Sequence, residues 1–355
     1  MQERRSLKVG IFMPNNSGSM SISTYKPDPD DWTFESNKKI AQAAEVAGMD
    51  FVFPVSRWKG FGGESDYMGN SLETMTWAAG LLMATEKIEV YSTVHVPVFN
   101  PVVAAKMGAT LDHISNGRWG INIVSGWNKE EFEMMGIDML PHENRYKRTE
   151  DFIRCLKGLW CEKPGTFDFE SPYYKIQGGN CRPQPVRRPH PPIVNAGQSD
   201  DALSVVSRNC DWCFTAPIDI GAAATITKDV KKRAQEAGRE LRVVAGIMPI
   251  WDDDPDLPLR ERDHLVKAAD PVAIDNWASG VGLESGSFDE VTYEMFAFGA
   301  GSYPLLGTPD DIVAGLRDLY DVGVDGVLMS FLRYQRDTER FGQEIRPRLV
   351  KAGLI

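Results

Sequence analysis

Six polar or aromatic residues stand at or just after the ends of apolar, β-rich stretches: Arg57, Thr93, Asn122, Trp127, Glu131 and Ser199. Asn122 is the most informative of them, because it lies in an apolar run between Ile121 and Ile123. A buried amide costs roughly 1–3 kcal/mol unless it is hydrogen-bonded. Either a neighbouring backbone group satisfies this amide or the amide faces a polar ligand.

The residues after this run suit a ligand site. Ser125 and Gly126 turn the chain. Trp127 then offers a face for stacking, and Glu131 offers a hydrogen-bond acceptor. Polar groups late in a strand, followed by a turn with an aromatic residue and carboxylates, are typical of α/β sites at the C-terminal ends of strands.

Two further motifs occupy equivalent positions. Arg57-Trp58 follows a strand predicted over residues 50–55, as either a surface pair whose alkyl and ring parts cover apolar surface or a ligand clamp. Ser199 is placed to cap a helix after a strand predicted over 193–196. Such a helix start is either a phosphate site or an ordinary capped helix.

Composition narrows the class of protein. The 355 residues carry a net charge of −11, with 42% hydrophobic and 25% charged residues. This acidic balance argues against nucleic acid or an anionic membrane as the main partner. We find neither a charged-then-apolar leader nor an apolar run of about 18 residues, so we expect a cytoplasmic protein.

The cysteines do not indicate a metal site. Five are scattered along the chain, and Cys210 and Cys213 form a CxxC without a second pair or a nearby histidine. We expect reduced, partly buried thiols and no bound metal.

Strands and helices alternate about eight times over the whole length, which favours a single TIM (β/α)8 barrel domain over residues 1–355. Two insertions interrupt the pattern, near 161–192, with a small hairpin, and near 251–302, with short helices. Residues 15–32 form a long polar loop that is either functional or disordered. All six residues above then fall at the face where barrel enzymes keep their sites.

Three stretches, NIVSGWNKEEFEMMGI, HENRYKRTEDFIRCLKGLW and VNAGQSDDA, resemble the bacterial luciferase-like flavin monooxygenases. Within that superfamily the chain is similar to the branch of the pyrimidine and dimethylsulfone monooxygenases. The resemblance implies a two-component, FMN-dependent enzyme with a luciferase-like TIM barrel. A separate flavin reductase, fed by NAD(P)H, supplies reduced FMN, which reacts with O2 to oxygenate a small substrate, such as a pyrimidine, lactam or amide-containing heterocycle.

The resemblance also implies roles for individual residues. FMN would be held by Arg57, Trp58, Asn122, Glu131, Arg145, Tyr146 and Ser199, the last three at its phosphate. Thr93, Asn122 and Phe53 would line an oxygen pocket beside a flavin-N5-peroxide. Trp127, Glu131 and His95 would contact the substrate; His95 stands where the pyrimidine enzyme has alanine.

Other functions stay open. The substrate could instead be a sulfone or sulfonate, the protein could sequester flavin without catalysis, or the cofactor could be a deazaflavin. The family also implies a homo-oligomer, either a dimer or a tetramer.

Overall fold

The computed structural model describes residues 5–280 and 290–355. The chain divides into two compact units. Unit 1 comprises Met1–Leu72, Thr215–Lys228 and Val243–Ile355, and unit 2 comprises Glu73–Phe214 and Asp229–Arg242. Part of the expected 251–302 insertion, residues 281–289, lies outside the described residues.

Unit 1 is built on a parallel sheet with the strand order β10-β9-β11-β1-β2. The strands are β1 (Lys8–Phe12), β2 (Phe51–Phe53), β9 (Arg242–Trp251), β10 (Tyr303–Gly307) and β11 (Gly326–Met329). Side chains of β1, β2, β9 and β11 are buried almost throughout, as in parallel sheets covered by helices. Gly10 is required at its position, because a Cβ there would lie 2.0 Å from the Phe51 ring.

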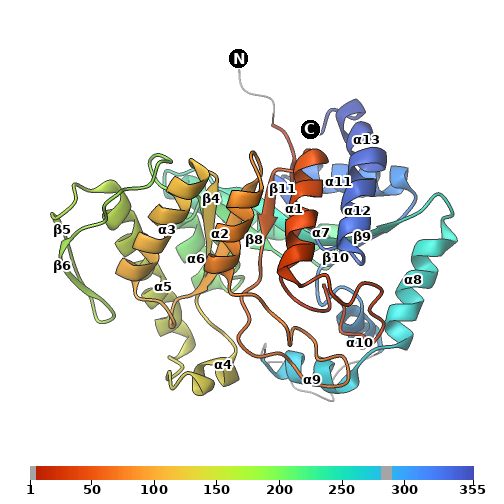
Figure 1. Ribbon diagram of the computed structural model, residues 1–355, viewed down its shortest axis with the longest axis horizontal. Helices are drawn as coiled ribbons and strands as arrows, with labels where there is room; N and C mark the ends of the chain where they lie inside the picture. The colour runs from red at the N-terminus through yellow and green to blue at the C-terminus, as the bar shows by residue number, and fades with distance from the viewer. Residues whose placement is uncertain (1–4, 281–289) are drawn as a thin grey trace. The chain divides into compact units, whose positions relative to one another are not determined.

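The helices of unit 1 follow the capping signals of the sequence. They are α1 (Phe34–Val46), α8 (Asp256–Lys267), α9 (Pro271–Gly280), α10 (Glu290–Ala297), α11 (Pro309–Asp321), α12 (Tyr334–Arg340), the π-helix η1 (Phe341–Ile345) and α13 (Arg346–Lys351). Thr308 and Asp311 form a capping box at the start of α11. Helix α1 packs against α12 (Figure 1).

Unit 2 carries four parallel strands in the order β3-β4-β7-β8. Its strands are β3 (Glu89–His95), β4 (Trp119–Val124), β7 (Ile193–Asn195) and β8 (Trp212–Thr215, of which Thr215 belongs to unit 1). Its helices are α2 (Thr74–Ala84), α3 (Pro101–Ser115), α4 (Lys129–Met134), α5 (His142–Cys161) and α6 (Asp200–Asn209), and α7 (Ile220–Glu236) runs from unit 1 into unit 2.

The predicted excursion at 161–192 contains the antiparallel hairpin of β5 (Phe167–Glu170) and β6 (Lys175–Gly179). The hairpin extends from the end of unit 2 beside α5 (Figure 1). The expected small hairpin is confirmed.

Eight parallel strands, β1, β2, β3, β4, β7, β8, β9 and β11, alternate with helices along the chain. The predicted TIM (β/α)8 fold is confirmed. Strand β10 and helix α4 are additions that the periodicity did not indicate.

The first part of the polar segment after β1 is packed inward. The side chains of Asn15, Ser17, Ser21 and Ser23 are at most 6% exposed. The side chains of residues 15–23 are thus packed inward for the most part, whereas those of residues 24–32 are half-buried or exposed.

All five cysteines are free thiols, and Cys161 alone among them is exposed. Burial raises the pKa of Cys155 and of Cys213 to about 12. Within the described residues, no group of three or more His, Cys, Asp or Glu side chains is arranged to hold a metal ion. No helix in the same part of the chain has the length and apolarity to span a membrane.

Candidate active site

Thr93 and Asn122 form a buried polar pair at the C-terminal ends of two neighbouring strands. They are direct partners in the register of β3 and β4. Asn122 Nδ2 donates a hydrogen bond of 3.3 Å to Thr93 Oγ1, and the two residues are 5% and 3% exposed. Asn122 Oδ1 is buried and has no hydrogen-bond partner among the described residues. The Thr93 hydroxyl thus accepts a hydrogen bond from the amide N–H group of Asn122, and the amide carbonyl oxygen remains available to a ligand.

The strand end that carries Thr93 is fixed by the first residue of α2. Thr74 Oγ1 donates to the Thr93 carbonyl at 2.6 Å and accepts from the Thr93 N–H at 3.2 Å. Ser92 Oγ donates to the Thr74 carbonyl at 3.1 Å. Because these bonds hold the backbone, the Thr93–Asn122 pair is positioned before any ligand binds.

His95 and Glu131 form a second buried pair. His95 Nδ1 lies 3.8 Å from Glu131 Oε2, and their side chains are 2% and 0% exposed. The ring of His95 also meets the ring of Phe132 edge-on, with centroids 6.0 Å apart. These contacts join the first turn of α4 to the end of β3.

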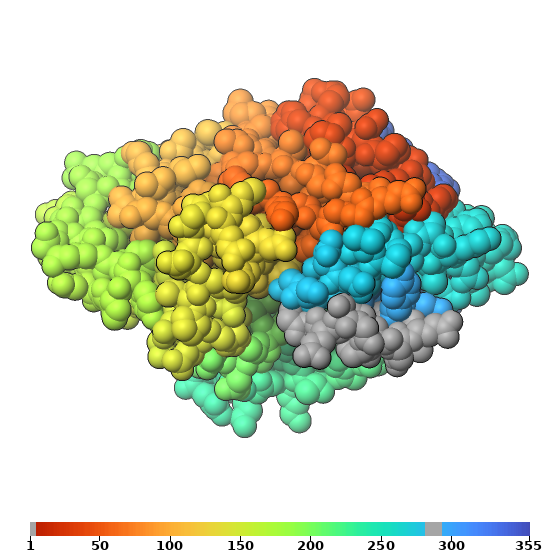
Figure 2. Space-filling view, turned by 90° about the horizontal axis from the view of Figure 1, so that it is seen from below, coloured from red at the N-terminus to blue at the C-terminus, as the bar shows by residue number. Residues whose placement is uncertain are grey.

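Trp127 is half-buried in the turn between β4 and α4. Asn128 caps α4 by accepting a hydrogen bond from the Glu130 N–H. Gly126 has a φ of +91°, and a Cβ there would lie 2.5 Å from Phe132 Cζ. Glycine is therefore needed for this turn to close over α4. The α4 region, yellow in Figure 2, lies on the surface of unit 2.

Arg145 ties the start of α5 to the same turn. Its Nη1 donates to the Gly126 carbonyl at 2.6 Å, and Thr149 one turn later donates to Ser125 Oγ at 2.8 Å. Arg145 Nε is buried without a hydrogen-bond partner in the part of the chain that the structure describes. The guanidinium group thus retains a donor for an anionic ligand.

Tyr146 lies beside the start of α6. A Cβ on Gly197 would lie 3.2 Å from Tyr146 Cε1, and Ser199 caps the helix by accepting from the Ala202 N–H at 3.3 Å. Asn195 holds the intervening turn, since its Oδ1 accepts from the Gly197 N–H at 2.8 Å. A phenol and a helix N-terminus therefore converge here, which suits a phosphate group.

The two acidic residues that open α6 would repel a phosphate if they were unpaired. Asp200 accepts from Arg233 Nη2 at 2.6 Å. Asp201 lies 3.8 Å from His142 Nδ1, and the His142 ring packs against Tyr146. Asp200 is thus paired with a guanidinium group, which weakens its effect on the anion site.

Unit 1 holds the remaining predicted residues. Phe53 is 2% exposed and packs against Phe12, with ring centroids 6.1 Å apart. Arg57 is 7% exposed, with Nε donating to the Ser56 carbonyl at 2.7 Å, while Trp58 is 36% exposed. Arg57 is thus buried, whereas its neighbour Trp58 lies at the surface.

Sequence reasoning missed two positioning residues, Asn15 and Asn195. Asn15 Nδ2 donates to the carbonyls of Val55 and Leu72, and its Oδ1 accepts from the Val55 N–H. Asn15 therefore holds the segment that leads to Arg57. The available signal was an asparagine shortly after an apolar run, at Asn15, and an asparagine two residues before a glycine, at Asn195.

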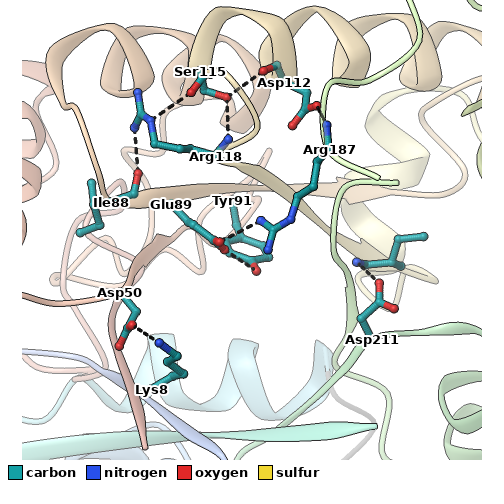
Figure 3. Close-up of polar contacts among 11 residues, drawn as sticks. Lys8, Asp50, Ile88, Glu89, Tyr91, Asp112, Ser115, Arg118, Arg187 and Asp211 are labelled. Carbon is teal, nitrogen blue, oxygen red and sulfur yellow. Dashed lines mark hydrogen bonds and ion pairs between the residues drawn. The ribbon is translucent and has the colours of Figure 1, made fainter. Parts of the chain in front are cut away.

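The N-terminal ends of the strands have a different chemistry (Figure 3). In unit 2, Arg187 pairs with Glu89 at 2.8 Å, and Tyr91 donates to the same carboxylate at 3.2 Å. In unit 1, Lys8 pairs with Asp50 at 2.7 Å. Ion pairs therefore join exposed and half-buried side chains at this end of the strands.

The chain matches the family model described as luciferase-like monooxygenase over residues 7–326. It is 31% identical to an FMNH2-dependent dimethylsulfone monooxygenase of Pseudomonas putida, over 96% of this chain and 94% of the relative. It is 30% identical to pyrimidine monooxygenase RutA of Escherichia coli O81 (strain ED1a), over 98% of this chain and 92% of the relative.

Among solved structures, a riboflavin lyase, RcaE, with modified FMN and riboflavin has a similar fold. The TM-score is 0.89 at 21% identity, over 99% of this chain and 92% of that one. At this identity the likeness shows the fold alone. The extent of the family match and of the two related sequences settles the classification: the chain belongs to the luciferase-like monooxygenase family.

Proposed function

We propose that this enzyme is the oxygenase component of a two-component system that uses reduced FMN and O2 to oxygenate or oxidatively cleave a small polar substrate. A pyrimidine, a lactam or another amide-containing heterocycle is the leading substrate class. A separate flavin reductase, fed by NAD(P)H, supplies the reduced FMN. One oxygen atom of O2 would enter the product and the other would leave as water, with reduced FMN supplying the two electrons.

The unpartnered carbonyl oxygen of Asn122 carries this proposal. Its burial beside Thr93 would be unfavourable in a site that stays empty, because a buried acceptor without a hydrogen bond costs roughly 1–3 kcal/mol. A flavin ring offers N–H and carbonyl groups along one edge, and this amide can bond to such an edge. The residues present therefore fit FMN.

The remaining residues fall into two groups, one for each end of the cofactor. Arg145, Tyr146 and Ser199 would hold the phosphate, because a guanidinium donor, a phenol and a helix N-terminus all suit an anion. Asn122, Arg57, Trp58 and Glu131 would contact the rest of the flavin. When bound, reduced FMN supplies the electrons that activate O2.

The protein's own part is to place the reactants and to exclude water. Thr93 and Phe53 are almost fully buried, so each would shield a bound ligand from water. Trp127, His95 and Glu131 are the proposed substrate contacts. The His95–Glu131 pair is buried, so these two side chains already have fixed places beside the turn that carries Trp127.

A sulfone or sulfonate is the second candidate substrate. The two curated relatives, one named for dimethylsulfone and one for pyrimidines, are equally similar to this chain at 31% and 30% identity. His95 also favours a substrate other than a pyrimidine, since the pyrimidine branch is expected to have alanine there. We propose further that the enzyme is a homo-oligomer, a dimer or a tetramer.

The test supplies the purified enzyme with NADH, FMN and an unrelated flavin reductase under 18O2. Uracil, small lactams and dimethyl sulfone are the substrates, and mass spectrometry detects the products. We expect one labelled oxygen atom in a product that forms only with both proteins present. Tight FMN binding without any labelled product would instead favour a flavin-sequestering protein.

A further inference from the structure

The loops that follow β1 and β2 in unit 1 are joined into one layer by backbone hydrogen bonds. The Ser17 N–H donates to the Asn70 carbonyl at 3.0 Å, and the Met68 N–H donates to the Ser17 carbonyl at 3.1 Å. The Leu72 N–H donates to the Asn15 carbonyl at 3.1 Å. Since β1 and β2 are parallel neighbours, this layer covers their C-terminal ends, where barrel enzymes bind ligands.

Tyr67 points inward from this layer and is held there on several sides. Its side chain is 0% exposed and packs on Phe61, with ring centroids 5.9 Å apart. Gly18, at φ +98°, makes room for the ring, since a Cβ there would lie 2.9 Å from Tyr67 Cδ2. The Phe61 N–H donates to the Tyr67 carbonyl at 2.9 Å and closes the loop behind it.

The backbone on both sides of Tyr67 adopts an unfavourable conformation. Asp66 has a φ of 43° and Met68 a φ of 55°, although neither residue is glycine. Left-handed residues other than glycine persist only where the surrounding structure enforces them, and they concentrate at functional sites. The strain here keeps one phenol ring buried.

The hydroxyl of that ring has no hydrogen-bond partner among the described residues. The other buried tyrosines among the described residues have partners: Tyr334 donates to the Phe12 carbonyl at 2.7 Å, Tyr91 donates to Glu89 at 3.2 Å, and the Tyr174 hydroxyl accepts from Arg148 Nε at 3.1 Å. A native protein seldom buries a phenol O–H without a partner, so such a group calls for a ligand or a water molecule.

The electrostatic surroundings identify what the ligand must offer. Burial and the neighbouring Tyr334 raise the pKa of Tyr67 far above its ordinary value, and the nearby Arg57 guanidinium opposes this shift. The phenol therefore keeps its proton and acts as a donor. Arg57 is also buried, and its guanidinium group presents donors only.

We infer that the Tyr67 hydroxyl is a ligand-binding group that donates a hydrogen bond to an acceptor oxygen of a molecule bound beside Arg57. The oxygen is a carbonyl of the flavin ring, or a carbonyl or sulfonyl oxygen of the organic substrate. The inference rests on the proposed function only for the identity of this molecule.

Tyr67→Phe tests the inference, because it removes the hydroxyl and keeps the ring that fills the loop. Tyr91→Phe is the matched control, since it removes a buried hydroxyl that has its own partner at the opposite ends of the strands. FMN affinity is measured by quenching of flavin fluorescence on the full-length protein. Substrate affinity is measured by titrating FMN-loaded enzyme with uracil or dimethyl sulfone and following the flavin absorption spectrum, without reductase or NADH.

We expect Tyr67→Phe to weaken one of these two affinities about tenfold, the usual effect of losing one ligand hydrogen bond. A loss in the FMN arm assigns the hydroxyl to the flavin, and a loss in the second arm alone assigns it to the substrate. Thermal unfolding should be unchanged or occur at higher temperature, because an unsatisfied buried group is removed. Tyr91→Phe should lower the melting temperature and leave both affinities unchanged.

Unchanged affinities in both arms, with a raised melting temperature, would overturn the inference and make the hydroxyl a merely unsatisfied group. If neither organic probe binds the wild-type protein, the FMN arm alone decides. Both readouts are independent of turnover, so a failure of the oxygenation experiment leaves this result interpretable.

Discussion

The side-chain N–H group of Asn122 donates a hydrogen bond to Thr93, and its carbonyl oxygen is available to a ligand. Asn122→Leu keeps a side chain of similar length and removes both groups. We expect the FMN dissociation constant to rise about tenfold, since one ligand hydrogen bond is worth roughly 1–3 kcal/mol. Fluorescence titration measures the affinity, and circular dichroism verifies the fold. A folded variant that binds FMN like the wild type would remove Asn122 from the site.

Ser199 permits a substitution that separates capping from phosphate binding. Aspartate is as good an N-cap as serine, so Ser199→Asp should preserve α6. Its negative charge would repel the flavin phosphate, and we expect the FMN dissociation constant to rise about tenfold for a repulsion of roughly 1.4 kcal/mol. Riboflavin, which lacks the phosphate, is the matched ligand and should bind as before. An equal loss for both ligands would place the phosphate elsewhere.

Asp31 makes the stability of unit 1 depend on pH. Burial raises its pKa to about 7, with Asp28, Asp30 and Asp337 adding to the shift and the Tyr334 N–H opposing it. The folded state therefore binds this proton more tightly than the unfolded state does. The free energy of unfolding should fall as pH rises from about 4 to about 7, at up to roughly 1.4 kcal/mol per pH unit.

Asp31→Asn tests this dependence, since it keeps the shape of the side chain without the titrating proton. Urea unfolding of both proteins at several pH values gives the slopes. The variant should show a flatter dependence in this range, and an identical slope in the two proteins would assign the effect to other groups.

At the scale of elements, Arg118 joins the C-terminal end of α2 to the start of β4. Its guanidinium donates to the carbonyls of Leu82, Thr85 and Ile88 at 2.8–3.0 Å (Figure 3 shows the bond to Ile88). These carbonyls lie at and beyond the last turn of α2, where a cation is favourable.

Arg118→Met should therefore lower the free energy of unfolding by about 3 kcal/mol, because it leaves several carbonyls of this region without their donor. Arg154→Met is the control, because Arg154 is exposed and makes a long ion pair of 3.5 Å with Asp151. This substitution should lower the free energy of unfolding by less than about 1 kcal/mol. Denaturant unfolding measures both. FMN affinity below the transition should stay at the wild-type value, because Arg118 lies at the strand end opposite the site.

The long elements could be predicted from sequence because their signals are local. Asn100 caps α3 directly before a proline, and Thr308 with Asp311 opens α11 with a capping box. Helix α4 has only six residues and depends on the buried contacts of Glu131 and Phe132, which no local signal encodes. Strand β10 is half-exposed and has no distinct periodic pattern.

The site was predictable where an unusual residue stands in an apolar strand, as at Asn122. It was not predictable at Tyr67, because the surrounding loop reads as ordinary glycine-rich sequence. Its inward direction depends on hydrogen bonds to Ser17 and on the space above Gly18, both distant in the chain. Polar loops that bury their side chains cannot be recognised from composition alone.

At the scale of the whole molecule, FMN should stabilise the folded protein. A ligand that binds only the folded state adds about 2.7 kcal/mol at one hundred times its dissociation constant. Differential scanning calorimetry with oxidised FMN measures this gain. Riboflavin at equal concentration should give a smaller shift, and an unchanged melting temperature with FMN would contradict a site preformed in the folded protein.

The distribution of thiols makes the two units distinguishable in an unfolding experiment. All five cysteines belong to unit 2, and Cys161 is the exposed one. A thiol-reactive dye therefore labels one position in the intact protein. Further labelling counts molecules in which unit 2 has opened, while unit 1 contributes no signal. The rate of cysteine labelling therefore reports the opening of unit 2 without any engineered reporter group.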